Sequence, residues 1–140
     1  MKISIDEVCF SPIGQFDTVK KPNWDDIEKA IRLLETETGS VEIWINGQKS
    51  HVMIAGEKGE YYLVFVDPSF FLIDNSKPVS NELDRKTIGI FHGECLKHNT
   101  IDDIEVVVKM VKSYLTSGEY KDAAPFVWLD SNEEAMRFSY

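Results

Sequence analysis

The stretch of this chain with the most obvious chemical potential is His92-Gly93-Glu94-Cys95-Leu96-Lys97-His98. Its His-x-x-Cys-x-x-His spacing offers imidazole and thiolate ligands at intervals that zinc sites use. A structural zinc ion needs a fourth protein ligand, and the remaining candidates, Cys9 and His51, are far away in the sequence. An extended backbone would also send Cys95 to the opposite face from both histidines. We therefore predict a loop with surface histidines and a packed cysteine, with no bound metal or cofactor.

A carboxylate and an imidazole, Glu42 and His51, fall on neighbouring predicted strands. Such a pair can serve in acid–base catalysis. On a solvated sheet face it is more often a cross-strand ion pair worth about 0.2–1 kcal/mol. No activated nucleophile accompanies it, so we predict that the chain is not an enzyme. The alternatives are a small enzyme or ligand-binding domain with a site around His51, His92 and Glu94, or a structural subunit of a larger complex.

The elements that would position these residues centre on a three-stranded antiparallel meander over residues 41–66. The aliphatic residues Val41, Ile43 and Ile45 alternate with Glu42, Trp44 and Asn46, which is the two-residue period of a strand with unequal faces. Asn46-Gly47 suits a two-residue type I′ turn, which would place Glu42 opposite His51. A second turn at residues 56–59 leads into residues 61–66, which are apolar on both faces and belong inside a sheet.

Two amphipathic helices flank the meander, at residues 24–38 and 101–117, each with apolar residues at intervals of three and four. Asn23 and Asp26 form a capping-box pair for the first helix, and Gly39 ends it. Thr100 caps the second helix, and Gly118 ends it. Shorter strands are expected at residues 3–8, 70–73, 87–91 and 126–129, and residues 11–22 as a loop. The predicted fold class is α+β, with two helices packed on a mostly antiparallel sheet in a single domain over residues 1–140, of which 131–140 are a polar tail.

Charge bounds the partners of this chain, because 24 acidic against 15 basic residues give 140 residues a net charge of −9. Binding to nucleic-acid phosphates or to anionic membranes depends on Lys and Arg, so neither partner is expected. A basic protein surface is the natural complement, although acidic surfaces also simply keep small domains soluble.

The cellular location is expected to be cytoplasmic. The N-terminus turns acidic before an apolar signal-peptide core develops. No apolar run approaches the roughly 20 residues of a membrane span. Cys9 and Cys95 are then expected to be free, mostly buried thiols.

Several features in order resemble one known family. Trp24 opens an amphipathic helix, the Gly-containing hairpin and aromatic strand of residues 54–64 follow, and a late helix ending at Gly118 leads into Pro125-Phe126-Val127-Trp128. This order is similar to that of the Imm1-type immunity proteins of bacterial polymorphic toxin systems. The resemblance spans roughly residues 24–129 and departs from the family in the long connection between Asp67 and Lys86. It implies a non-enzymatic inhibitor that binds a co-encoded toxin protein and blocks its active site or substrate path.

The sequence also indicates where such a partner would bind. If the toxin is a nuclease, its substrate groove is basic and an acidic partner complements it. Loops carry binding function disproportionately, and the long connection bears carboxylates. The predicted partner-binding residues are therefore a possible aromatic anchor and the acids of this connection: Trp44, Asp67, Asp74, Glu82 and Asp84.

Overall fold

The computed structural model describes residues 2–12, 17–66, 70–74, 86–88, 93–95 and 100–130. Within these residues, eight strands form one antiparallel sheet in the order β10-β6-β5-β4-β3-β1-β2, with β9 paired to β5, and two further strands pair with each other. The sheet strands are β1 (Ile5–Pro12), β2 (Asp17–Lys20), β3 (Gly39–Ile45), β4 (Ser50–Glu57), β5 (Glu60–Val66), β6 (Phe70–Asp74), β9 (Thr100–Ile101) and β10 (Phe126–Asp130). The separate pair is β7 (Lys86–Ile88) and β8 (Gly93–Cys95), and the helices are α1 (Trp24–Arg32), which continues into the 3-10 turn η1 (Leu33–Glu35), and α2 (Ile104–Ser117).

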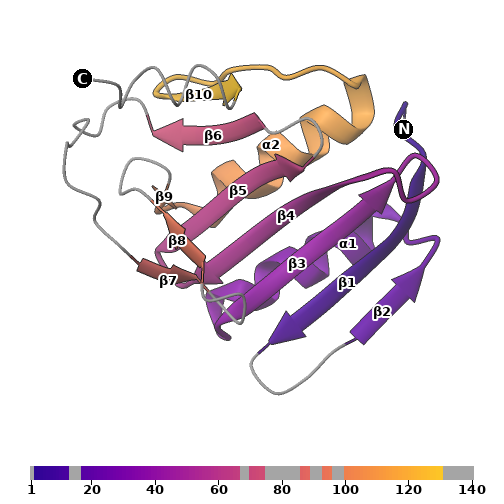
Figure 1. Cartoon of the computed structure of the whole chain (residues 1–140), viewed down its shortest axis with the longest axis horizontal. Helices are drawn as coiled ribbons and strands as arrows, with labels where there is room; N and C mark the ends of the chain where they lie inside the picture. Colours follow the sequence, from indigo (N-terminus) through magenta and orange to yellow (C-terminus); the bar gives the residue numbers. More distant parts are fainter. Residues whose placement is uncertain are drawn as a thin grey trace.

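Both helices cover the same face of the sheet, behind it in the view of Figure 1. The buried core between the layers takes alternate residues from the central strands, including Val41, Ile43 and Ile45 of β3, each 0% exposed. The strand β5 lies inside the sheet, between β4 on one side and β6 and β9 on the other. The predicted α+β class, with two helices against an antiparallel sheet, is confirmed.

An aromatic cluster closes one end of this core. The ring of Tyr120 stacks on Phe70 at a centroid distance of 4.1 Å and meets Trp128 edge-on at 5.2 Å. Tyr114 of α2 lies 4.9 Å from Tyr120 and 4.4 Å from Phe65 of β5. Burial raises the pKa of the Tyr120 hydroxyl well above its usual value. The cluster ties the segment after α2 to the sheet, and it holds Trp128 half-buried against the core.

The helix α1 begins as predicted and ends earlier. The Asn23 side chain accepts a hydrogen bond from the Asp26 backbone N–H (2.9 Å), and the Asn23 N–H donates to the Asp26 carboxylate (3.0 Å), which is the expected capping box. The prediction that Gly39 stops the helix is wrong. The chain tightens into η1 after Arg32, and Gly39 is the first residue of β3, opposite Gly56.

The helix α2 begins three residues later than predicted. Asp103, not Thr100, is the N-cap, and its carboxylate accepts a hydrogen bond from the Glu105 N–H at 2.9 Å. Thr100 and Ile101 instead form β9 and pair with Tyr62 and Tyr61. At the other end Gly118 adopts φ +73° and donates its N–H to the Tyr114 carbonyl, so the predicted stop is confirmed.

The connection between β3 and β4 has four residues rather than two. Ile45 pairs with Ser50, and the loop between them bends through positive φ at Asn46, Gly47 and Gln48. The predicted pairing of Glu42 with His51 is therefore wrong, since Trp44 faces His51 and Glu42 faces Met53. The register moved by two residues, so every side chain keeps its predicted face.

The segment predicted as a loop over residues 11–22 contains a strand. Ser11 and Pro12 extend β1, and β2 pairs with β1 as the edge of the sheet. All four β2 residues are exposed, including Val19 at 44%. A strand without a buried face produces no apolar alternation, so periodicity could not reveal it.

Gly56 is the residue of the β4–β5 hairpin least able to accept a side chain. It adopts φ +139°, and a Cβ atom there would collide with the backbone carbonyl of Glu60, whereas Gly59 has φ +81° and open space around it. We expect Gly56→Ala to lower the free energy of unfolding by about 3 kcal/mol or more, because strain and collision add. Gly59→Ala should cost only about 1 kcal/mol. Urea unfolding of both variants checks this, and equal losses would contradict it.

Candidate functional site

The candidate site lies on the outer face of the sheet, the face turned away from both helices. Cross-strand pairing aligns Lys20, Glu7, Trp44, His51 and Val66 in one row across β2, β1, β3, β4 and β5. Directly opposite residues in antiparallel strands share a face, so these side chains are neighbours. The row places polar and aromatic groups together at one end of the outer face.

Three of the side chains here form what we call the Trp44 patch: Glu42, Trp44 and His51. The indole and imidazole rings lie 4.2 Å apart between centroids, with their planes tilted by 32°. The Trp44 indole N–H donates a hydrogen bond to Glu42 Oε2 at 3.2 Å. All three side chains are half-buried. The patch therefore presents an aromatic surface next to a carboxylate, and the indole is held by the His51 ring and by the hydrogen bond to Glu42.

Beside the patch lies a second group, the Glu7 cluster: Glu7, Cys9, Thr18, Lys20 and Gln48. Glu7 is only 8% exposed. Its carboxylate accepts hydrogen bonds from Lys20 Nζ at 3.0 Å and Gln48 Nε2 at 2.6 Å, and from the Cys9 thiol at 3.6 Å. A buried carboxylate needs such donors, because an unpaired buried charge is costly. The cluster satisfies itself and ties β2 and the β3–β4 loop to β1.

Cys9 is the one thiol whose surroundings the structure describes, and it is buried. Burial raises the pKa of the Cys9 thiol, the neighbouring Glu7 raises it further, and the hydrogen bond from Thr18 partly opposes the shift. A reactive cysteine needs a lowered pKa. The expected buried, free thiol is confirmed for Cys9, whose setting suits a structural rather than a nucleophilic role.

The remaining outer face is largely apolar. Val64 and Ala55 are buried there, Met53 is half-buried, and Tyr62 lies 6.0 Å from Phe71 between ring centroids. The apolar run of β5 is continuous because the residues of this strand are buried on the helix side and largely covered on the outer side as well.

The predicted partner-binding residues fall in different places. Trp44 is half-exposed on the outer face, whereas Asp74 ends β6, three strands away, opposite Phe126 of β10. Asp67, Glu82 and Asp84 lie outside the described residues. The structure thus unites Trp44 with His51 and Glu42, and separates Trp44 from Asp74.

The residues considered for a metal or an alternative site are only partly described. His92 and His98 lie outside the described residues, and Glu94 and Cys95 belong to β8. Among the residues that the structure places, no three His, Cys, Asp or Glu side chains are arranged to hold a metal ion. In that same part of the chain, no helix has both the length and the apolar character to cross a membrane.

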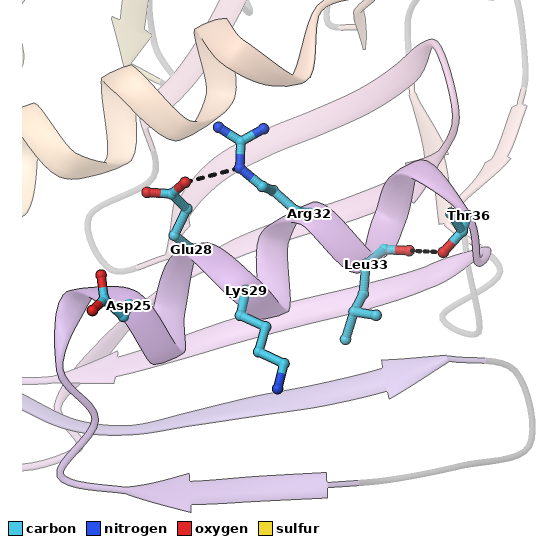
Figure 2. Close-up of a pocket in the computed structure, with 6 residues that line it drawn as sticks. All are labelled: Asp25, Glu28, Lys29, Arg32, Leu33 and Thr36. Atoms are coloured by element: carbon cyan, nitrogen blue, oxygen red, sulfur yellow. Dashed lines mark hydrogen bonds and ion pairs between the residues drawn. The ribbon is translucent and has the colours of Figure 1, made fainter.

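A shallow hollow of 490 Å³ opens on the outer side of α1, lined by Asp25, Glu28, Lys29, Arg32, Leu33 and Thr36. Figure 2 shows Glu28 and Arg32 on one side of the helix, and Lys29 and Leu33 on the other. Arg32 already binds Glu28 at 2.9 Å and Glu105 of α2 through two bonds of 2.7 and 3.0 Å. Its charge is used to join the helices, so the hollow offers little to a ligand.

Sequence reasoning singled out Trp44, Glu42 and His51, but it missed the Glu7 cluster. The alternation of Glu7 and Cys9 with the core residues Val8 and Phe10 was the available signal. Comparison with protein-family models, curated proteins and solved structures gives no match to this chain. The case for a function therefore comes from the chain itself.

The protonation of His51 provides a test of the Trp44 patch. Burial lowers the pKa of His51 below its ordinary value of 6.5, and Glu42 partly opposes this shift. A lowered folded pKa means that stability is complete above 6.5 and is lost as the pH falls through the folded pKa. We expect NMR titration of His51 to give a midpoint below 6.5, and His51→Gln to remove this contribution to acid destabilisation. A midpoint above 6.5 would contradict the burial argument.

Cys9 provides a second test. In a Cys95→Ser background, where Cys9 is the only thiol, we expect it to react with a disulfide reagent at about pH 8 at least ~10-fold more slowly than glutathione. Thr18→Val should slow it further, because the hydrogen bond from the hydroxyl lowers the pKa of Cys9. Reaction as fast as glutathione in the folded protein would contradict the raised pKa.

Proposed function

We propose that this chain is an immunity protein that binds and neutralises a cognate bacterial toxin domain in a one-to-one complex. The observation that carries the proposal is the Trp44 patch, which exposes an aromatic ring and a carboxylate on the sheet of a chain with a net charge of −9. Protein interfaces concentrate binding energy in a few aromatic or charged anchors. An acidic surface also speeds encounter with a basic partner.

The geometry of the patch suits protein binding better than catalysis. Cys9 is a buried thiol with a raised pKa, and His51 stacks on Trp44. Glu42, the nearest acid to His51, receives the indole N–H. A catalytic site needs a nucleophile or a substrate within reach of a base. Binding a protein through an aromatic anchor requires neither of these.

The acidic connection of Asp67, Asp74, Glu82 and Asp84 stays part of the proposed contact surface. Asp74 lies on the third strand from β3, and β6 runs away from the end of β5 where Val66 lies in the Trp44 row. With strands about 4.8 Å apart and about 3.3 Å per residue, Trp44 and Asp74 are separated by roughly 20 Å. In the register of β6, Asp74 follows Phe70 and Leu72 at intervals of two, and those two residues pack in the core on the helix side, whereas Trp44 is on the outer face. A contact that includes both therefore has to reach around the sheet.

Co-expression with the toxin domain encoded next to this chain tests the proposal. We expect the wild-type chain to restore growth, and Trp44→Ala to weaken the complex by about 2–4 kcal/mol because an anchor is truncated. Asp25→Ala, on the opposite face of the molecule, is the matched control and should bind like wild type. Binding is measured calorimetrically with a catalytically inactive toxin.

Two results separate the parts of this proposal. Failure of the folded wild-type chain to protect against its neighbouring toxin would refute the immunity function. Full protection and unchanged affinity in Trp44→Ala would leave immunity standing and place the contact elsewhere. The combined change Glu82→Gln and Asp84→Asn then tests the acidic connection by the same measurement.

A further inference from the structure

We propose that the Trp44 patch binds one arginine side chain of the partner, with the guanidinium on the exposed part of the indole and paired with the Glu42 carboxylate. The inference rests on the proposed function and names the chemistry that the toxin would bring to this surface.

The carboxylate of Glu42 forms no ion pair with any residue that the structure describes. Its only hydrogen bond within the described part of the chain is the one from the Trp44 indole, to Oε2. By contrast, the carboxylate of Glu7, which lies on β1 opposite Trp44, accepts hydrogen bonds from a lysine, an amide and a thiol. Glu28 and Glu105 both accept hydrogen bonds from the Arg32 guanidinium. Glu42 is therefore a half-buried carboxylate whose Oε1 has no hydrogen-bond donor, and whose charge has no cation partner, among the placed residues.

The neighbouring groups do not supply that charge. Lys20, the cation at the end of the same row, places its Nζ 3.0 Å from Glu7. His51 lies against Trp44, and burial lowers its pKa, so it is neutral at physiological pH. A cation brought by a partner is the missing complement.

The shape of the patch favours arginine over lysine. A guanidinium is planar, stacks on aromatic rings and can bond to a carboxylate at the same time. An ammonium gains less from stacking and loses more hydration. His51 and Glu42 hold the indole in place, so little side-chain freedom is lost when the guanidinium binds.

The test uses the full chain and three small probes: the N-acetyl methylamides of arginine, lysine and citrulline. Citrulline has the shape of arginine without its charge. The indole N–H resonance of Trp44, assigned by its loss in Trp44→Phe, reports binding by NMR. We expect a saturable shift with the arginine probe, an affinity several-fold weaker with lysine, and no saturable shift with citrulline.

Variants locate the binding. Glu42→Gln keeps the acceptor for the indole N–H and removes the charge, and it should weaken arginine binding about tenfold. Glu57→Gln is the matched control on the same sheet, because Glu57 bonds the Thr38 hydroxyl at the far end of β4 and should leave the affinity unchanged. An arginine probe that binds no better than citrulline, or equally well to Glu42→Gln, would overturn the inference.

This outcome is separate from that of the immunity proposal. Arginine binding by a chain that protects against no toxin would refute immunity and retain the site. Protection by a chain whose Trp44 patch does not bind arginine would refute the arginine site and retain the immunity function.

Discussion

The apolar face that β3, β4 and β5 turn toward the helices is the constraint on which this structure depends. Its side chains are almost fully removed from water, and each is worth about 1.5–3 kcal/mol of burial. They are Val41, Ile43, Ile45, Val52, Ile54, Leu63 and Phe65. Because successive residues of a strand alternate between faces, this requirement also fixes which residues stand on the outer face. Glu42 and Trp44 lie on the outer face because they alternate with the core residues Val41, Ile43 and Ile45.

The outer face must then satisfy its own polar groups. Glu7 is buried at the margin of the sheet, and its partners come from β2 and from the β3–β4 loop. A second bond, from the Gln48 N–H to Asp6 Oδ2 at 2.6 Å, holds the same loop. One carboxylate thus organises an edge strand and a hairpin loop that no apolar pattern specifies. Glu42 has only the Trp44 indole as a donor among the residues that the structure describes. This difference between the two acids is the reason that the proposed contact uses Glu42 and not Glu7.

The sequence predicted those parts of the fold that depend on buried periodicity. Both helices, the central strands and the faces of their residues follow from the spacing of apolar residues and from the Asn23 and Gly118 signals. The antiparallel pairing of β3 with β4 followed as well, but its register did not, because a shift of two residues leaves every face unchanged. The Asn46-Gly47 signal favoured the shorter loop, but the chain satisfies Asp6 and Glu7 with Gln48 in the longer one.

The site was less predictable than the fold for a related reason. Periodicity assigned Trp44 to the same face as Glu42, two residues earlier on β3, but its contact with His51 depends on the register that periodicity leaves open. A register-independent feature is that all three residues lie on strands of a sheet anchored by its core. Groups held by regular elements are positioned more precisely than groups on loops. An aromatic ring with few rotatable bonds, already fixed by an imidazole and a carboxylate, pays little conformational entropy when a partner arrives. The same alternation that buries one face therefore holds an aromatic ring on the other face with little side-chain freedom, which is what the proposed arginine contact requires.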